Sequence, residues 1–272
     1  MFRPYNYHYS KTVCLANDSS IYSLLIMTTD VNENQNSIDN RPLYRMFSKV
    51  PARYDLLNRL LTLGLDQRWR KRAAEVCLES NPKRIMDLCS GTGDLAIELA
   101  KMTNGKSEII AADFCEPMLE VAKSKAAKAG VDSRISFRVA DAASLPVDDN
   151  YFDIVTIAFG FRNLTFKNPK TDIYLKEIFR VIAPGGWLVI VETSQPESAI
   201  LKKLSRLYYS VVVKYIGNAV SGERGAYSYL AYSARNYFKP SDVGELLTDV
   251  GFNPVDHRPL WGGVAALHVA KK

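Results

Sequence analysis

A glycine-rich turn flanked by carboxylates is the part of the sequence best suited to binding a small molecule. Residues 87–96 read Asp-Leu-Cys-Ser-Gly-Thr-Gly-Asp-Leu-Ala and continue a short apolar run. Glycines in such a turn let the backbone approach a ligand closely, because no Cβ stands in the way. The pattern predicts a ligand site around Gly91 and Gly93, with Asp87 and Asp94 beside it.

The charges at this turn distinguish two kinds of ligand. The turn formally meets the dinucleotide-binding fingerprint, through Gly91, Gly93 and Ala96. A dinucleotide would place its pyrophosphate against the turn, where Asp87 and Asp94 would repel it. S-adenosylmethionine (SAM) instead carries an ammonium and a sulfonium group, which carboxylates attract. Asp113 ends the next apolar run and suits the ribose hydroxyls of either ligand, so it does not distinguish them. The charges at the turn itself favour SAM.

A third acidic position strengthens this interpretation. Asp141 and Ala142 follow the third apolar run, and the carboxylate there suits the amino group of adenine. A lone glycine turn is often no more than a tight strand-to-helix connection whose acids cap helices. Acidic residues at or after three successive apolar runs argue against that simpler explanation here.

A parallel sheet would bring these three positions to one edge. After residue 82, short apolar runs alternate with helical patterns, which is typical of βαβ units. Strands are expected at 84–89, 108–113, 135–140, 153–159 and 187–192, with two closing strands near 252–258 and 264–270. Helices are expected at 94–102, 117–129, 169–182 and 241–250, and a turn at 184–186. The sequence therefore predicts an α/β, Rossmann-like fold: a doubly wound, mostly parallel sheet of seven strands with helices on both faces.

Helical segments before and within this pattern are expected to cover the site. Two helices are expected between residues 50 and 76, with Gly64 ending the first and Asp66 capping the second. An insertion at 195–238 precedes the closing strands, and we expect a helical lid there. Its residues 198–216 alternate apolar with basic side chains. That pattern fits either peripheral docking on an anionic membrane surface or an ordinary lid helix with a solvated face.

Composition limits the alternatives for domains and partners. With 272 residues and 47% hydrophobic content, one catalytic domain is expected, over residues 41–272. The net charge of +6 suits an anionic partner, and we favour a membrane surface over nucleic acid because no base-binding motif is present. The cysteines and histidines show no ligand-like spacing, so we expect no metal and a reducing, cytoplasmic compartment.

The first 40 residues differ from the rest of the chain. They are polar, lack a sustained helical or strand period, and carry two basic residues against four acidic ones. An organelle transit peptide would be rich in arginine and poor in acids. We interpret residues 1–40 as a disordered or non-native tail, and translation from Met27 instead of Met1 stays open.

Three separate motifs resemble those of the UbiE/MenG-type quinone C-methyltransferases. Residues 54–58, Tyr-Asp-Leu-Leu-Asn, resemble the amino-terminal signature of that family, and 180–186, Arg-Val-Ile-Ala-Pro-Gly-Gly, resemble its second signature except at Ala183. Residues 159–163, Phe-Gly-Phe-Arg-Asn, resemble its active-site segment. The resemblance covers nearly everything from Tyr44 onward. It implies a class I SAM-dependent enzyme that methylates a ring carbon of a polyprenyl quinol in menaquinone or ubiquinone synthesis.

The resemblance also implies which residues contact the methyl donor. These are Thr92, Asp113, Asp141 and Ala142. Ala158 stands where ubiquinone-branch enzymes usually have a donor-contacting serine and menaquinone-branch relatives often have glycine. A backbone contact can survive at this position, and the missing hydroxyl favours the menaquinone branch weakly.

Four residues are candidates for the reaction itself. The acceptor hydroxyl resembles a phenol with a pKa of about 10, and it must lose or share its proton before the ring carbon becomes nucleophilic. Arg162 stays protonated, so we expect it to stabilise the quinolate and not to act as the base. Asn163 is expected to orient the ring or a water. Tyr54 and Asp55 are expected to close the pocket, with Asp55 as a candidate proton relay through water.

Other interpretations stay open at this point. Arg162 could pair with a surface acid, Asn163 could cap a turn, and Tyr54 could simply pack. The chain could also methylate oxygen or nitrogen of a small molecule, or bind SAM as a non-catalytic scaffold in a quinone-synthesis assembly. The general base, the acceptor ring, the prenyl length and the oligomeric state, for which a homodimer is one option, are not fixed by the sequence.

Overall fold

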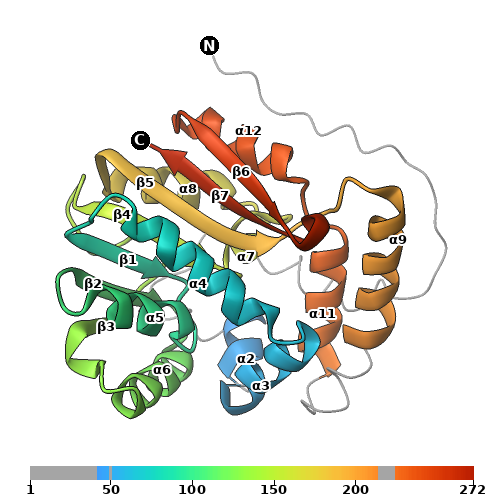
Figure 1. The fold of residues 1–272 in the computed structure, drawn as a ribbon, viewed down its shortest axis with the longest axis horizontal. Helices are drawn as coiled ribbons and strands as arrows, with labels where there is room; N and C mark the ends of the chain where they lie inside the picture. Colours follow the sequence, from blue (N-terminus) through green and yellow to red (C-terminus); the bar gives the residue numbers. More distant parts are fainter. Residues whose placement is uncertain (1–41, 49–50, 214–223) are drawn as a thin grey trace. The chain divides into compact units, whose positions relative to one another are not determined.

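A seven-stranded sheet with helices packed on both faces forms the core of the protein (Figure 1). The computed structural model describes residues 42–48, 51–213 and 224–272. The predicted tail at 1–40 and the alternative start at Met27 lie outside these described residues. Residues Ile38–Lys272 group into one compact unit.

Five parallel strands make up most of the sheet. They are β1 (Arg84–Leu88), β2 (Glu108–Asp113), β3 (Ile135–Val139), β4 (Phe152–Ala158) and β5 (Ile182–Thr193). Strand β7 (Ala265–Lys271) runs antiparallel to β5 and to β6 (Val255–Leu260). The order across the sheet is β3-β2-β1-β4-β5-β7-β6, so the chain builds outward from β1 and then restarts beside it at β4. The predicted mostly parallel, doubly wound sheet is confirmed.

The two faces of the sheet are covered by different helices. On one face lie α4 (Leu65–Leu78), α5 (Asp94–Thr103) and α6 (Glu116–Lys128), and on the other α8 (Thr171–Val181) and α12 (Pro240–Val250). Side chains alternate across a strand. In β4, Ile154 therefore packs in the α4–α5 layer, whereas its neighbour Val155 packs in the α8–α12 layer.

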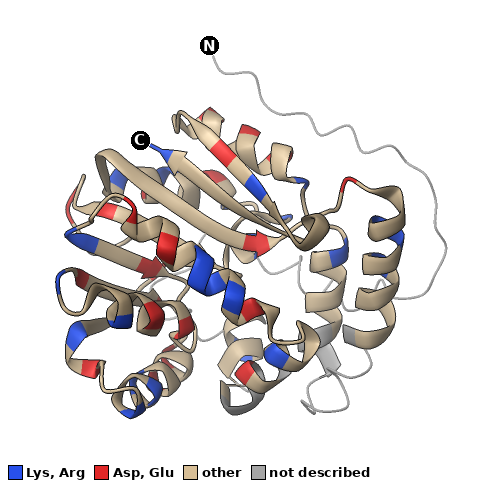
Figure 2. Cartoon of the chain, in the orientation of Figure 1, with Lys and Arg blue, Asp and Glu red and all other residues tan. Residues whose placement is uncertain are grey.

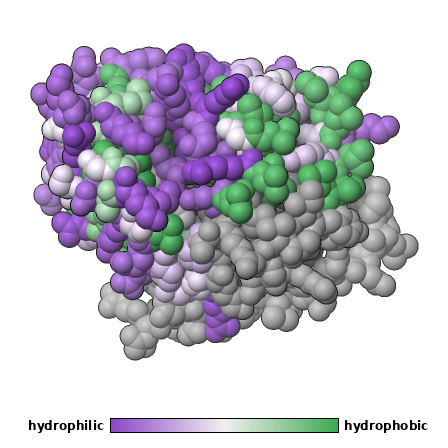
Figure 3. Space-filling model, turned by 60° about the horizontal axis from the view of Figure 1, so that its bottom comes forward, coloured by the Kyte–Doolittle hydropathy of each residue, from purple (hydrophilic) through white to green (hydrophobic). Residues whose placement is uncertain are grey.

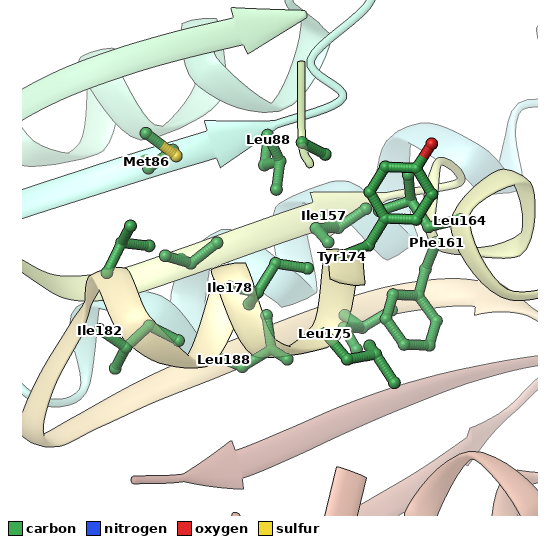
Figure 4. Close-up of a cluster of buried hydrophobic side chains, with 14 of the residues drawn as sticks. Met86, Leu88, Ile157, Phe161, Leu164, Tyr174, Leu175, Ile178, Ile182 and Leu188 are labelled. Carbon is green, nitrogen blue, oxygen red and sulfur yellow. The ribbon is translucent and has the colours of Figure 1, made fainter. Parts of the chain in front are cut away.

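The core has two main clusters of buried side chains, one on each face of the sheet. The larger core cluster, on the α8–α12 face, anchors the short helix α7 (Phe161–Thr165) to the sheet. Ile157 of β4, Phe161 of α7 and Ile178 of α8 are fully buried in this cluster (Figure 4). Phe161 directly precedes Arg162 and Asn163. The core therefore fixes where these two candidate residues leave the sheet.

Some element boundaries differ from those expected. The described chain has a further short helix, α2 (Pro42–Ser48), before α3 (Pro51–Leu61) and α4. Gly64, at a φ of 75°, separates α3 from α4 as predicted, but Asp66 is not the cap. Asp66 lies inside the first turn, buried, and its Oδ2 accepts a hydrogen bond from Nη1 of Arg70 at 2.6 Å. Residues 184–186, predicted as a turn, lie within β5.

Most of the described part of the insertion after β5 is helical. It contains α9 (Ala199–Tyr208), the π-helix η3 (Tyr209–Val213) and α11 (Arg224–Arg235), and the predicted helical insertion is confirmed there. Nη1 of Arg235 donates to Oγ of Ser210 at 3.0 Å and so joins α11 to η3. The Tyr208 hydroxyl donates to the Leu61 carbonyl and joins α9 to α3. These bonds place the insertion beside the amino-terminal helices.

Ile157 tests how much the larger core cluster stabilises the fold. We expect Ile157→Ala to lower the free energy of unfolding by about 2 to 5 kcal/mol, because it removes buried methyl groups and leaves a cavity. Ile173→Ala on α8 is the control, since Ile173 is 51% exposed, and it should cost no more than about 0.5 kcal/mol. Urea denaturation measures both values. Equal losses would contradict the described core.

Candidate active site

The candidate site lies at the carboxyl edge of the sheet, between β1 and β4. These strands pair with each other although β2 and β3 separate them in the chain, so the strand order reverses here. Ligands of open α/β sheets bind at such reversal points. The two loops approach closely, because a Cβ added to Gly160 would lie 2.5 Å from Cβ of Cys89. Only glycine at position 160 permits this approach.

The loop after β1 holds the predicted glycine turn. Gly91 and Gly93 have φ values of 54° and 78°, which residues with side chains rarely adopt. A Cβ at Gly93 would also lie 2.8 Å from Cβ of Ala122 on α6. The turn therefore requires both glycines, and it delivers the chain to the start of α5 at Asp94.

Asp113, at the end of β2, holds this turn in place. Its Oδ2 accepts the Gly91 N–H at 2.8 Å, and its Oδ1 accepts the Cys115 N–H at 2.8 Å. Burial raises the pKa of Asp113 to about 6, although these N–H groups act to lower it. The structure thus places Asp113, which was predicted to contact ribose hydroxyls, at the glycine turn.

Asp87 is a second buried carboxylate beneath the turn. Its Oδ2 accepts the Ala96 N–H at 3.1 Å, whereas its Oδ1 is buried and has no partner among the described residues. Oγ of Ser90 is likewise buried without a described partner. Burial raises the pKa of Asp87 to about 8. Buried polar atoms without partners are costly, so a ligand with hydrogen-bond donors fits this position.

Carboxylates from several strands converge on the end of β1. Burial raises the pKa of the Cys89 thiol well above its usual value, and four nearby carboxylates raise it further, those of Asp113, Asp87, Asp141 and Glu192. The charges of the three acids predicted from sequence and of an additional acid on β5 therefore all act at Cys89. Oδ1 of Asp141 accepts the Ala143 N–H at 3.0 Å, and Ala142 beside it is buried. Ala158 ends β4 at the same edge.

Asp55, on α3, lies at the glycine turn. Its Oδ1 accepts a hydrogen bond from Oγ1 of Thr92 at 2.5 Å, and its Oδ2 pairs with Nζ of Lys125 on α6. No described hydrogen bond joins Asp55 to Arg162 or Asn163. The structure therefore places Asp55 with the residues predicted to bind the donor. Tyr54 lies on α3, but its side chain is outside the described residues.

Lys125 is a site residue that the sequence analysis missed. Its Nζ pairs with both Asp55 and Asp94 and lies 3.3 Å from Oγ1 of Thr92. Burial acts to raise the pKa of Asp94, but Lys125 and nearby arginines outweigh it, so the pKa lies below its usual value. Lys125 thus connects α3, α5 and α6 at the glycine turn.

Arg162 forms a buried ion pair with Glu192 of β5. The two residues are 2% and 1% exposed, and Nη1 of Arg162 donates to Oε1 of Glu192 at 3.1 Å and to Oγ1 of Thr193 at 2.6 Å. The Arg162 main-chain N–H also donates to Oε2 of Glu192 at 3.0 Å. Burial acts to lower the pKa of Arg162, but Glu192 and neighbouring tyrosines raise it above its usual value. The partner is thus a buried acid and not a surface one.

Asn163 faces the insertion. Its Oδ1 lies 3.4 Å from the Tyr229 hydroxyl on α11, and its main-chain carbonyl accepts a hydrogen bond from Nδ2 of Asn168 at 2.9 Å. Arg162 and Asn163 therefore lie between the sheet edge and the insertion, while the acidic residues lie around the glycine turn.

Lys125 can be tested without any ligand. We expect Lys125→Met to lower the free energy of unfolding by about 1 to 3 kcal/mol and to speed hydrogen exchange in α3, because Asp55 and Asp94 lose their shared cation. Lys123→Met is the matched control, since Lys123 is exposed and pairs only with Glu120 in the described structure. Surface pairs of that kind contribute little. Equal exchange rates for α3 in the two variants would show that Lys125 does not hold the helix.

Comparisons with known proteins identify the family of the chain. The sequence model described as the ubiE/COQ5 methyltransferase family matches residues 30–272. The chain is 44% identical over 227 residues to the demethylmenaquinone methyltransferase of Thermus thermophilus, across 84% of this chain and 100% of that protein. It is 34% identical over 223 residues to the ubiquinone/menaquinone biosynthesis C-methyltransferase UbiE of Shewanella oneidensis, across 82% of this chain and 87% of that protein.

Solved structures share the fold at lower identity. A putative O-methyltransferase from Nostoc punctiforme matches with a TM-score of 0.61 and 17% identity, over 93% of this chain and 68% of that one. Human N-acetylserotonin methyltransferase, solved in complex with SAM, matches with a TM-score of 0.56 and 18% identity, over 93% of this chain and 66% of that one. At these identities the structures show the fold alone. The match of the family model to most of the chain, together with these relatives, shows that the protein belongs to the ubiE/COQ5 methyltransferase family.

Proposed function

We propose that this protein transfers a methyl group from SAM to a ring carbon of a polyprenyl quinol, with demethylmenaquinol as the preferred acceptor. The observation that carries the proposal is that buried carboxyl groups, those of Asp87 and Asp113, lie at the same sheet edge as a buried arginine, Arg162. The acids suit a cationic donor, and the arginine suits an acceptor that becomes anionic. The names of the relatives support a quinol acceptor, and the higher identity among those compared above is to the demethylmenaquinone enzyme.

The residues around the glycine turn fit SAM. Oδ1 of Asp87 and Oγ of Ser90 are buried without described partners, as a site for the ammonium group requires. We assign Asp113 to the ribose hydroxyls, and Asp141 with Ala142 to the adenine. Thr92 completes the turn, with Asp55 and Lys125 fixing its side chain. When bound, SAM supplies a methyl group activated by its sulfonium.

The proposed reaction needs an ionised acceptor and an aligned approach. The acceptor hydroxyl gives its proton to water, and the ring carbon then bonds to the methyl carbon as the methyl–sulfur bond breaks. The ring carbon then loses its proton to water, the ring regains its aromaticity, and the ring oxygen takes up a proton. The products are the methylated quinol, S-adenosylhomocysteine and one net proton. Arg162 favours the ionised oxygen through its positive charge. The loops after β1 and β4 hold the two substrates in line and limit water.

A product analysis tests this proposal and separates it from the two alternatives. The purified protein is incubated with methyl-labelled SAM and either reduced demethylmenaquinol or its benzoquinol counterpart, and the product is examined by mass spectrometry and NMR. We expect a new carbon–methyl bond on the naphthoquinol ring. A methyl on a quinol oxygen would replace the proposal with O-methylation. Donor binding without any methylated product would support the scaffold.

Donor binding is expected to release protons near neutral pH. Burial holds the pKa of Asp87 at about 8 without ligand, so its carboxyl group is mostly protonated at pH 7. An ammonium group beside it stabilises the ionised form and lowers that pKa, so the proton leaves, and donor affinity should rise with pH up to about 8. Calorimetry in two buffers of different ionisation enthalpy should count roughly one proton for the natural protein and far less for Asp87→Asn. Equal release in both would contradict the assignment.

We also propose that α9 docks on an anionic membrane surface. Ile200, Leu204, Leu207 and Val211 recur at helical spacing along α9 and η3, and all four are exposed; we call them the α9 stripe. Exposed Trp261 lies near α9, because a Cβ at neighbouring Gly262 would lie 2.8 Å from Cδ1 of Leu201 on that helix. Hydrophobic side chains gather on this side of the molecule (Figure 3).

Charge and substrate chemistry favour lipid as the occupant of the α9 stripe. Lys202, Lys203 and Arg206 lie on the same helix, so α9 combines apolar and basic side chains (Figure 2). A polyprenyl quinol partitions into the bilayer, so an enzyme for it benefits from docking there. No helix in the described part of the chain is long and apolar enough to cross a membrane.

The α9 stripe can be tested with vesicles. Leu204→Glu with Leu207→Glu should reduce co-sedimentation with phosphatidylglycerol-containing vesicles by about tenfold or more, because carboxylates replace side chains that are 56% and 60% exposed and would enter the lipid. Ile173→Glu on α8 is the control and should bind as the natural protein does. Unchanged binding would contradict lipid docking. A dimer in vesicle-free solution that the double variant converts to monomers would show that a second copy covers the stripe instead.

A further inference from the structure

Three tyrosines of the insertion interact electrostatically with the Arg162–Glu192 pair. Tyr209 begins η3, Tyr229 lies on α11, and Tyr237 follows α11. The charges of both Arg162 and Glu192 act on all three phenols. The charges of one buried ion pair therefore act on three phenols from separate positions, and Tyr229 also contacts Asn163 beside the pair. None of the three has a role in the reaction as derived so far.

The three hydroxyls differ in how firmly they are bonded. The Tyr237 hydroxyl lies 2.9 Å from Oγ1 of Thr165, and both atoms are buried, so this hydroxyl is occupied within the protein. The Tyr229 hydroxyl donates to Oδ1 of Asn163 at 3.4 Å, which is long and therefore weak. Tyr209 makes no hydrogen bond through its hydroxyl to the residues that the structure describes. Tyr229 and Tyr209 can thus bond a ligand at little cost, whereas Tyr237 cannot.

Hydrogen bonds hold these tyrosines in position before any ligand arrives. Nε2 of Gln195, just beyond β5, donates to the Ala234 carbonyl at 3.0 Å and so fixes the end of α11 at the sheet edge. The Arg235–Ser210 bond fixes η3 against α11. Donors that are already in place cost no reorganisation when charge develops on a substrate.

The tyrosines are hydrogen-bond donors and not bases at neutral pH. Burial raises the pKa of Tyr209 to about 12; Arg162 acts to lower it, while Glu192 and Tyr208 act to raise it. Burial also raises the pKa of Tyr229, again against the charge of Arg162 and with that of Glu192. Both phenols therefore keep their protons and can offer them to an anion.

The guanidinium of Arg162 also has capacity left. Nη1 carries its described hydrogen bonds to Glu192 and Thr193, while Nε is buried and has no described partner. A buried donor without a partner costs about 1 to 3 kcal/mol. An anionic oxygen at this place would satisfy the guanidinium and exchange the weak Tyr229–Asn163 bond for a stronger, charge-assisted one.

We propose that Tyr229 and Tyr209 form, together with Arg162 and Asn163, a subsite that binds the ionised oxygen of the acceptor ring. The ligand is a phenolate-type oxygen, and its proton passes to water while the tyrosines keep theirs. This proposal rests on the proposed function, because it names the site that would hold the quinol oxygen. The subsite lowers the pKa of the bound hydroxyl by supplying neutral donors beside a cation whose charge Glu192 partly offsets.

A chromophoric phenol tests the subsite apart from methyl transfer. The probe is 2-naphthol, whose absorbance changes when its hydroxyl ionises, titrated with pH in the presence of excess full-length protein and S-adenosylhomocysteine. The natural protein should lower the pKa of bound 2-naphthol from the ordinary phenol value of about 10. Tyr229→Phe should raise the bound pKa back by about one unit, a tenfold change in the ionisation constant. Tyr209→Phe, a second variant, should raise it in the same direction.

Tyr237→Phe and Tyr208→Phe are matched controls. Each removes one hydroxyl, but those hydroxyls bond Thr165 and the Leu61 carbonyl respectively. These variants should lower the melting temperature and leave the pKa of bound 2-naphthol unchanged. In methyl-transfer assays, only Tyr229→Phe and Tyr209→Phe should lower kcat at neutral pH and regain activity as the pH rises.

The outcomes separate this proposal from the proposed function. A bound pKa that is the same in Tyr229→Phe, Tyr209→Phe and the natural protein would overturn the subsite, as would an equal shift in the Tyr237→Phe control. Failure of 2-naphthol to bind or to ionise more readily on the natural protein would also overturn it. If 2-naphthol behaves as expected while no quinol is methylated, the subsite stands and the proposed acceptor is wrong.

Discussion

The buried ion pair between Arg162 and Glu192 is the interaction on which the acceptor side of the structure depends. Removing two such charges from water costs several kcal/mol per ion, so a buried pair is weak evidence for stability and needs another explanation. Here the pair joins α7 to β5 through the Arg162 main chain and side chain, and tyrosines on η3 and α11 interact electrostatically with Arg162. The pair keeps a guanidinium fixed inside the protein, where its field is less screened than in water.

The glycine turn also holds buried ionisable groups, but these are acidic. Burial keeps the carboxyl groups of Asp87 and Asp113 partly protonated, and one oxygen of Asp87 lacks a partner among the described residues. A cationic ligand would relieve this cost. Lys125 connects the turn to α3 through Asp55, so the amino-terminal helices and the turn are coupled before a donor binds. The glycine turn after β1 therefore carries buried acidic groups, whereas the loop after β4 carries a buried cation, and the two suit ligands of opposite charge.

The sequence predicted the features that local patterns determine. Alternating apolar runs predicted the sheet, and the rule that parallel strands end at one edge brought Asp87, Asp113 and Asp141 together. Long-range packing determined the rest. Nothing in the local pattern distinguishes Lys125 from Lys123, and only the packing of α3 near α6 gives Lys125 its partners. Asp66 was expected as a helix cap, but it lies inside α4 and pairs with Arg70 of the same helix.

The central claim is that a cationic donor binds among the carboxylates while the acceptor binds beside Arg162. A crystal structure with S-adenosylhomocysteine tests this claim most directly, because it shows which charged residues the ligand contacts. We expect the ligand amino group at Asp87, its ribose at Asp113, and its sulfur directed toward the loop that carries Gly160 and Arg162. A ligand whose carboxylate binds Arg162, or which leaves Asp87 and Asp113 without contact, would contradict the account.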